Sequence, residues 1–171
     1  MTKNITPAQL KDLDQIMIIE NAGFSLDEAA SDVSMAERIR LIPDTFLVAR
    51  DGDTVLGYVV GPALNQRYLT DELFEKSTPN SPDDVFQTIL SLAVSPDHQK
   101  KGVAGQLLTA LKDVAIFQHR QAITLTCLAR LVTFYEAHGY VNEGVSASTH
   151  AGEVWYNLVL PLTDEAKDIG E

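Results

Sequence analysis

The sequence lacks the features that mark several specialised classes of protein. It has a single cysteine, Cys127, which excludes an intramolecular disulfide and a cysteine cluster for zinc. The first residues, Met1 to Asn4, contain no apolar segment like that of a secretory signal, and no hydrophobic run approaches the ~18 residues that span a membrane. We therefore expect a soluble, cytoplasmic protein without a membrane partner.

Positive charge is also scarce. The chain has 13 Lys and Arg against 24 Asp and Glu, which gives a net charge of -11 at pH 7. A field of this sign repels nucleic acids and weakly favours cationic ligands such as amines. We expect no nucleic-acid partner.

The length and composition fit one domain. With 171 residues and 45% hydrophobic content, the chain can bury a single sizeable core, so we assign residues 1–171 to one domain. There are no internal repeats or low-complexity tracts. Residues 163–171 are acidic, and we expect this tail to fray.

Capping and turn signals predict the order of the elements. Thr6-Pro7 is typical of a helix start and predicts a helix over 7–22, and a capping box at Ser34 predicts another over 34–41. Apolar strands 46–49 and 55–60 around a Gly-containing turn predict an antiparallel hairpin. The later patterns predict a long loop over 61–84 with a short helix at 69–74, followed by a central strand over 86–94 and an amphipathic helix over 103–118. They then predict a strand over 122–128, a short helix over 131–138 and a terminal pair of strands over 140–146 and 153–160. This order predicts an α+β fold with a mixed, mostly antiparallel sheet flanked by helices.

One stretch, Leu92 to Leu108, combines a buried strand, a small-residue loop with two lysines and an amphipathic helix. The N–H groups and positive dipole of a helix N-terminus attract a phosphate where no side chain blocks the approach. Gly102, Ala104 and Gly105 keep that approach clear. The loop has neither the GxxxxGKS/T nor the GxGxxG pattern of common nucleotide sites. We therefore expect an anionic ligand held in a different kind of cradle.

Two motifs connect this cradle to a known superfamily. The Q-x-x-G-x-A pattern of residues 99–104 resembles the phosphate-binding signature of the GNAT superfamily of N-acetyltransferases, and residues 134–140, FYEAHGY, resemble a second GNAT segment. The expected order of elements is similar to the GNAT topology over nearly the whole chain. The resemblance implies a GNAT fold, acetyl-CoA as co-substrate and no metal. The residues that it places against acetyl-CoA are Leu92, Ala93, Val94, Gln99, Lys100, Lys101, Gly102, Val103, Ala104 and Gly105.

Three further segments resemble the arylalkylamine (serotonin) N-acetyltransferases more narrowly. They are residues 19–24, IENAGF, residues 67–72, RYLTDE, and residues 125–127, LTC. This resemblance implies that the acceptor is a small primary amine such as an arylalkylamine. It also implies that Phe24 lines the amine pocket, although a core position between the first two helices is an equal alternative for this ring.

Two other functions stay open at this point. One is acetylation of a protein N-terminus or lysine, which an open cleft between loops 61–84 and 147–152 would favour and a closed aromatic pocket would oppose. The other is a module that binds or senses acyl-CoA without catalysis. In each case the chain is expected to be a monomer or a homodimer.

Acetyl transfer to an amine requires three chemical groups in the active site. A base must take a proton from the amine because an ammonium has no lone pair, a donor must stabilise the oxyanion, and an acid must protonate the departing thiolate. The resemblance places the oxyanion donor on the backbone of residues 92–94. It assigns the acid to Tyr135.

The chain also departs from the family pattern. Leu128 stands where GNAT members commonly carry an asparagine, seven residues before the tyrosine. A histidine pair that relays the proton in arylalkylamine acetyltransferases is replaced by Thr88 and Leu90. The residues that remain as candidates for the base are Glu20, Ser91, His138 and His150.

Overall fold

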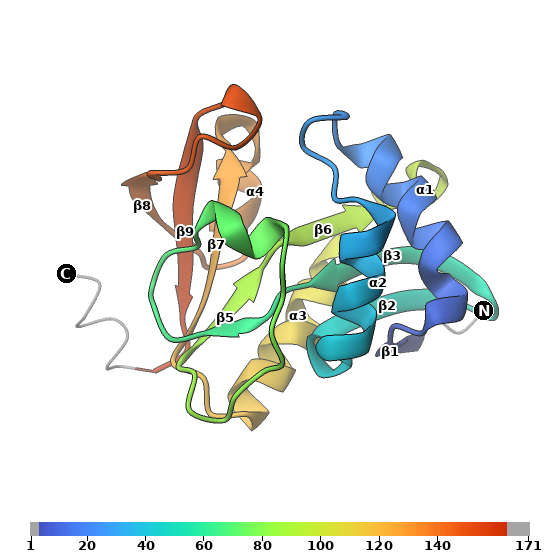
Figure 1. Cartoon of the computed structure of the whole chain (residues 1–171), viewed down its shortest axis with the longest axis horizontal. Coiled ribbons are helices and arrows are strands. Elements are labelled where there is room, and N and C mark those ends of the chain that lie inside the picture. Colours follow the sequence, from blue (N-terminus) through green and yellow to red (C-terminus); the bar gives the residue numbers. More distant parts are fainter. Residues whose placement is uncertain (1–3, 164–171) are drawn as a thin grey trace.

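The structure, a computed structural model, describes residues 4–163 and arranges their strands in two sheets (Figure 1). The first sheet has the order β1-β2-β3-β6 and the second the order β4-β5-β7-β9-β8. The strands are β1 (Asn4–Pro7), β2 (Phe46–Asp51), β3 (Thr54–Val60), β4 (Ala63–Leu64), β5 (Phe86–Ile89), β6 (Ser91–Val94), β7 (Ala122–Leu128), β8 (Val141–Val145) and β9 (Trp155–Pro161). The α-helices are α1 (Leu13–Gly23), α2 (Asp32–Leu41), α3 (Val103–Phe117) and α4 (Val132–Ala137). The 3-10 turns are η1 (Leu10–Asp12), η2 (Pro43–Thr45), η3 (Asp71–Phe74), η4 (Pro96–His98), η5 (Ala129–Leu131) and η6 (His150–Gly152).

The first sheet is apolar on both of its faces, because helices cover each face. Alternate residues of β2 point to opposite faces, as a strand requires. Leu47 and Ala49 belong to the core cluster that contains the apolar side of α3. Phe46 and Val48 belong to the cluster formed with α1 and α2. The first sheet is thus sandwiched between α3 and the α1–α2 pair (Figure 1).

The first described residues, Asn4–Pro7, form a strand, which corrects the predicted helix start at Thr6-Pro7. β1 pairs antiparallel with β2, with Pro7 opposite Leu47, and it forms the edge of the sheet. An edge strand tolerates proline because one side of the strand needs no hydrogen-bond donor. The helical segment begins with η1 instead, where the backbone N–H of Gln9 donates to Asp12 at 2.9 Å.

The second helix begins two residues before its predicted start, and its N-cap is three residues before the predicted one. α2 begins after Ser31, whose hydroxyl accepts a hydrogen bond from the backbone N–H of Ser34 at 3.1 Å. The predicted capping box at Ser34 is therefore wrong. Glu37, its expected reciprocal partner, accepts instead from the backbone N–H of Ser77 at 2.7 Å.

The later elements are confirmed close to their predicted bounds. β2 and β3 form the antiparallel hairpin, β7 and β9 pair antiparallel, and the long loop holds one short 3-10 turn, η3. β5 and β7 are parallel and are joined by the α3 crossover, which makes the sheet mixed but mostly antiparallel. Within residues 4–163 no helix is both long enough and apolar enough for a membrane span. The predicted fraying concerns a tail of which all but Thr163 lies outside the described residues.

The predicted central strand over 86–94 is present but is interrupted at Leu90. β5 lies in the second sheet and β6 in the first, and the backbone N–H of Leu90 donates to the carbonyl of Val60 at 2.7 Å. A glycine permits the close approach beside this break. A Cβ at Gly61 would lie 2.0 Å from the carbonyl oxygen of Thr88, so no larger residue fits there.

Candidate active site

A cavity lies where the two sheets separate. β5 and β7 run in parallel until Ile89 lies opposite Leu125, after which β6 pairs with β3 and β7 continues beside β9 (Figure 1). The cavity has a volume of about 460 Å³, and both diverging strands line it. Its walls include Leu92, the first of the strand residues 92–94 predicted to contact acetyl-CoA, and Ser91 directly before it.

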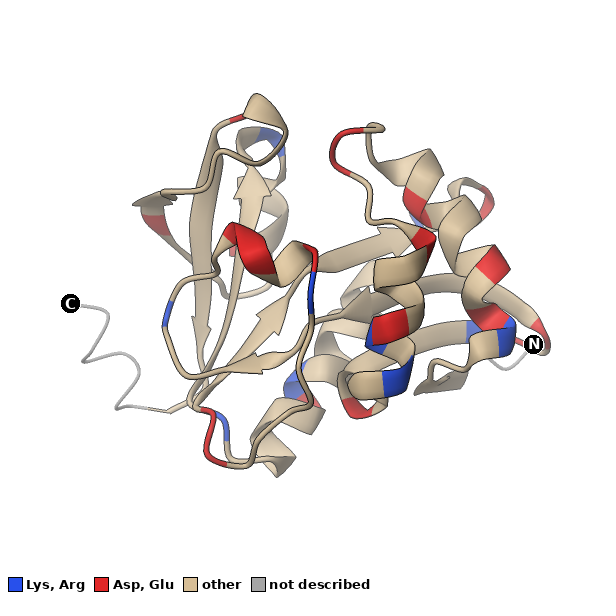
Figure 2. Ribbon diagram, in the orientation of Figure 1, with Lys and Arg blue, Asp and Glu red and all other residues tan. Residues whose placement is uncertain are grey.

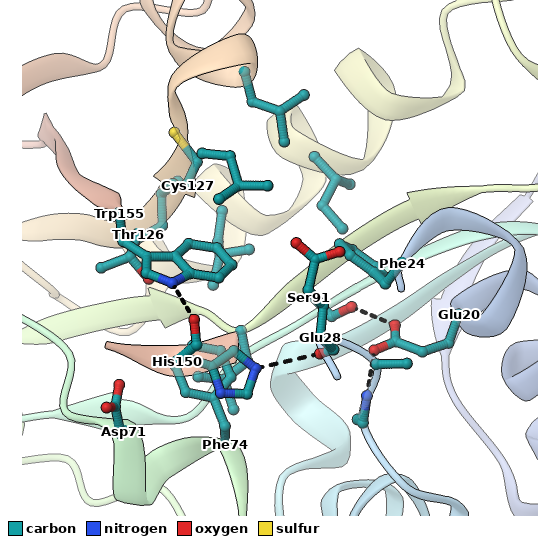
Figure 3. Close-up of a pocket in the computed structure, with 18 of the residues that line it drawn as sticks. Glu20, Phe24, Glu28, Asp71, Phe74, Ser91, Thr126, Cys127, His150 and Trp155 are labelled. Atoms are coloured by element: carbon teal, nitrogen blue, oxygen red, sulfur yellow. Dashed lines mark hydrogen bonds between the residues drawn. The ribbon is translucent and has the colours of Figure 1, made fainter. Parts of the chain in front are cut away.

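A buried carboxylate faces the cavity from α1. Glu20 is 3% exposed, and its Oε1 accepts hydrogen bonds from the hydroxyls of Ser91, at 2.6 Å, and Tyr58 (Figure 3). Its Oε2 accepts from the backbone N–H of Ala30 at 2.8 Å. Burial, reinforced by the charge of Glu20, raises the pKa of Tyr58, so that hydroxyl remains a donor. The carboxylate is thus held in a fixed orientation next to the cavity.

Tyr135, the predicted acid, also lines the cavity. It is 6% exposed and packs edge-on against Tyr140, with ring centroids 5.5 Å apart. Burial raises the pKa of Tyr135, and the neighbouring Cys127 adds to that effect. The hydroxyl is therefore protonated at neutral pH, as a proton donor must be. Burial likewise raises the pKa of Cys127 to about 12, which keeps this thiol protonated and weakly nucleophilic.

The N-terminus of α3 fits the anionic part of acetyl-CoA. Gly102 has a φ of 81°, which favours glycine, and no atom lies within 4 Å of where its Cβ would be. No side chain caps the helix, so its first N–H groups are available to a ligand. Lys100 and Lys101 are exposed beside it. A pyrophosphate can reach this backbone without displacing any protein group.

The other residues predicted to contact acetyl-CoA differ in what they can offer. Leu92 and Val94 are half-buried, whereas the side chains of Ala93 and Val103 lie in the core, so the last two can contribute only backbone groups. The amide of Gln99 donates to the carbonyl of Val94 at 3.3 Å and thus braces the loop. Ala104 and Gly105 are half-buried in the first turn of α3. Leu128, at the family's asparagine position, lines the cavity with an apolar side chain.

The structure separates the four candidates for the base. Glu20, Ser91 and His150 line the cavity. His138 lies elsewhere, in a hollow at the start of α3, where its Nδ1 lies 2.9 Å from the carbonyl oxygen of Phe134. Thr88, at one of the family's histidine positions, is fully buried and donates to the carbonyl of Pro62.

A segment of the long loop, residues 65–77, closes one side of the cavity, and we call it the strap. At its beginning, Arg67 forms a two-point ion pair with Glu143 of β8, at 2.8 and 2.6 Å. The Asp71 carboxylate accepts a hydrogen bond from the hydroxyl of Ser148 in the β8–β9 loop. At its end, the buried guanidinium of Arg38 on α2 donates to the carbonyl of Phe74 at 2.9 Å. The strap thus joins the second sheet to the helices of the first.

Aromatic rings supply much of the remaining lining. Phe24 reaches the cavity from the end of α1, on the same side as Glu20 (Figure 3). Phe74, His150 and Trp155 lie together on the opposite side (Figure 3). The cavity therefore offers a carboxylate on one wall and an aromatic cluster on the other.

Acidic residues surround the cavity. Glu28, Asp71 and Glu75 line it in addition to Glu20, and acidic residues mark the α1–α2 connection and η3 in Figure 2. These four acidic side chains outnumber the two arginines of the lining, Arg38 and Arg130, so the lining favours a cationic amine. Among the described residues, no group of three or more His, Cys, Asp and Glu side chains is placed to hold a metal ion.

Sequence reasoning missed Arg38, Tyr58 and Phe74. Arg38 is 1% exposed and occupies a core-facing position of α2, three residues after the buried Met35. An arginine at an apolar helix position is a signal that could have found it. Tyr58 and Phe74 give no comparable signal, because a strand or loop aromatic is ordinary core material.

The sequence profile described as the acetyltransferase (GNAT) domain matches residues 43–142, more than half of the chain. The chain belongs to the GNAT acetyltransferase family. This GNAT protein has the predicted fold and the predicted enzyme class, in which acetyl-CoA is the acetyl donor. No curated protein sequence matches it significantly.

Solved structures show the same fold at low sequence identity. The loading GNATL domain of CurA from Lyngbya majuscula has a TM-score of 0.79 at 14% identity, covering 94% of this chain and 98% of that one. Arabidopsis thaliana Naa50, in complex with a bisubstrate analogue of CoA and a peptide, has a TM-score of 0.71 at 15% identity, covering 93% of this chain and 98% of that one. YncA from Salmonella typhimurium, solved with acetyl-CoA, has 0.69 at 16%, covering 95% of both chains. At these identities the likeness concerns the fold and leaves the acceptor open.

Proposed function

We propose that this GNAT enzyme transfers the acetyl group of acetyl-CoA to a small primary amine. The contacts between the strap and the β8–β9 loop are the observation that carries the proposal. An open cleft between the long loop and the β8–β9 loop would admit a peptide, but here Asp71 and Phe74 of the strap contact Ser148 and His150 of that loop. These contacts favour a small acceptor.

Glu20 is the proposed base, with Ser91 as its link to the acceptor. A free alkylamine has a pKa near ~10.4, so it arrives protonated and must lose a proton before it can attack. Ser91 Oγ is 2.6 Å from Glu20 Oε1, and Ser91 directly precedes the strand residues proposed to face the thioester. The amine proton passes to Ser91 Oγ as the hydroxyl proton of Ser91 passes to Glu20. The negative field of the lining assists by attracting the cationic amine.

The reaction forms one C–N bond and breaks one C–S bond. Acetyl-CoA supplies the activated carbonyl. Backbone N–H groups of residues 92–94 donate to the carbonyl oxygen as negative charge develops on it. Tyr135, kept protonated by burial, donates its proton to the departing sulfur. The pyrophosphate is held by residues 99–105 at the start of α3.

The aromatic lining supports an arylalkylamine as the acceptor. A planar ring can pack between Phe24 on one wall and the Trp155 side of the cavity, while its amino group extends toward Ser91 (Figure 3). Because both sheets contribute to this cavity, we also propose that residues 1–171 act as one catalytic domain.

The test is the release of free CoA thiol from acetyl-CoA with a panel of acceptors. The panel comprises arylalkylamines, polyamines, amino sugars and peptides with a free N-terminus. We expect turnover with small amines, with arylalkylamines preferred. A preference for peptides would contradict the proposed acceptor class, and acetyl-CoA binding without turnover of any amine would favour a sensing module.

A further inference from the structure

His150 lies where three segments that enclose the cavity meet. Its ring stacks on Phe74 of the strap, with centroids 5.2 Å and planes 10° apart. It lies 5.8 Å from the ring of Trp155 on β9. Its Nε2 is 3.5 Å from the backbone carbonyl oxygen of Glu28 in the connection between α1 and α2 (Figure 3). One side chain thus contacts all three segments.

The backbone around His150 fixes the position of its ring. The indole N–H of Trp155 donates to the carbonyl of His150 at 2.8 Å, and the backbone N–H of His150 donates to the hydroxyl of Ser148 at 3.2 Å. Ala151 follows with a φ of 56°, a conformation that costs energy for a residue with a side chain. These features hold the ring against the strap.

The strap is attached differently at its two borders. Toward α2 its backbone is bound by side chains that include the buried Arg38, and by Glu37, which accepts from the N–H of Ser77. Toward the β8–β9 loop it is held by the stack of Phe74 on His150 and by Asp71, and these three side chains are half-buried or exposed. The contacts at His150 therefore involve more exposed side chains than those at α2, while the Arg67–Glu143 ion pair anchors the start of the strap to β8.

We infer that His150 is a specificity-determining residue. Its ring, stacked on Phe74, closes the acceptor side of the cavity and limits the enzyme to small amines. The inference rests on the proposed function. Loss of the ring removes the stacked part of the wall between the strap and the β8–β9 loop and leaves the Asp71–Ser148 hydrogen bond, so a peptide N-terminus gains access beside Phe74 while the acetyl-CoA cradle at α3 is unaffected.

The experiment compares two acceptors, phenylethylamine and a tripeptide amide with a free N-terminal alanine. For His150→Ala we expect the ratio of kcat/KM for the tripeptide to that for phenylethylamine to rise about 10-fold or more, with the KM for acetyl-CoA unchanged. His150→Phe retains a ring for the stack and should rescue the wild-type ratio. Phe117→Ala, at an 83% exposed position on α3, is the matched control and should leave the ratio unchanged.

A second measurement is independent of turnover. Trp155 is the single tryptophan of the chain, so its fluorescence reports on this border. Acrylamide should quench it more strongly in His150→Ala and in the milder Phe74→Leu than in the wild-type protein. An equal fall in turnover of both acceptors, or unchanged quenching, would overturn the inference. If the wild-type protein acetylates neither amine, the proposed function fails, and the quenching comparison still decides whether the ring closes the cavity.

Discussion

Replacement of Glu20 by glutamine tests the proposed proton path. The substitution keeps the size of the side chain and one oxygen acceptor, but it removes the charge. A general base contributes about 100- to 10,000-fold to the rate, equivalent to about 3–5 kcal/mol of activation free energy. We therefore expect kcat for a small amine to fall by that factor in Glu20→Gln, with the affinity for acetyl-CoA unchanged.

The structure also sets the cost of this substitution to folding. The carboxylate accepts from Ser91, Tyr58 and the N–H of Ala30, and the two hydroxyls can reorient toward an amide while the N–H cannot. A misplaced amide group costs about 1–3 kcal/mol, so the variant must first be shown to be folded at the assay temperature. Asp14→Asn removes the same charge from an exposed position of α1 and is the control.

The assay is kcat for the amine at one fixed pH at which both variants are folded, with Asp14→Asn measured alongside Glu20→Gln. A kcat of Glu20→Gln within about threefold of the wild-type value would refute the assignment, because the proton would then leave by another path.

Three further predictions concern other parts of the molecule. Tyr135→Phe should lower kcat by about 10- to 10,000-fold with little change in acetyl-CoA affinity, measured by thiol release and calorimetry; unchanged turnover would remove Tyr135 as the acid. Gly102→Val should raise the Kd for acetyl-CoA by about 10-fold or more, since lost hydrogen bonds to a charged group cost about 1.5–3 kcal/mol each. The control is Gly52→Val in the hairpin turn, where the glycine has a similar φ of 60°. It should introduce the same backbone strain and leave the Kd for acetyl-CoA unchanged. Asp12→Ala should lower the free energy of unfolding by about 3 kcal/mol in urea titrations, because it leaves the partner guanidinium of Arg50 without its carboxylate.

The Asp12 prediction also has a pH dependence. Burial acts to raise the pKa of this carboxyl, but the hydrogen bonds from Arg50 and from the N–H of Gln9 outweigh it, so the pKa lies below its ordinary value of 3.8. Its contribution to stability is then fully present above pH 3.8 and is lost as the pH falls through the lower folded-state pKa. The difference between wild type and Asp12→Ala should close over that acidic range; a difference that persists there would contradict the linkage.

Local signals in the sequence predicted most of the fold. The hairpin at Gly52, the amphipathic α3 and the apolar β7 each carry a pattern that is complete within a few residues. Thr6-Pro7 was misleading because its local signature is that of a helix start, whereas pairing with β2, some forty residues further along, decides its structure. Ser31 rather than Ser34 caps α2, and Glu37 binds the strap instead of its own helix N-terminus, a contact forty residues away along the chain.

The candidate site was predicted only in the part that depends on motifs. The cradle around Gly102 and the position of Tyr135 follow from short patterns. The grouping of Glu20 with Ser91 depends on a contact across 71 residues, and that of Asp71 with Ser148 on one across 77. No local pattern in the sequence predicts contacts between residues so far apart along the chain. The contacts between the strap and the β8–β9 loop, on which the proposed acceptor class depends, are therefore visible only in the three-dimensional arrangement.

The most direct test of the central claim is to follow both products of one reaction. The protein would be incubated with acetyl-CoA and either phenylethylamine or the alanine tripeptide amide, with thiol titration for free CoA and mass spectrometry for the acetylated acceptor. We expect N-acetylphenylethylamine in equal amount to the CoA released, and much slower acetylation of the tripeptide. Faster acetylation of the tripeptide, or acetyl-CoA binding with no acetylated amine, would contradict it.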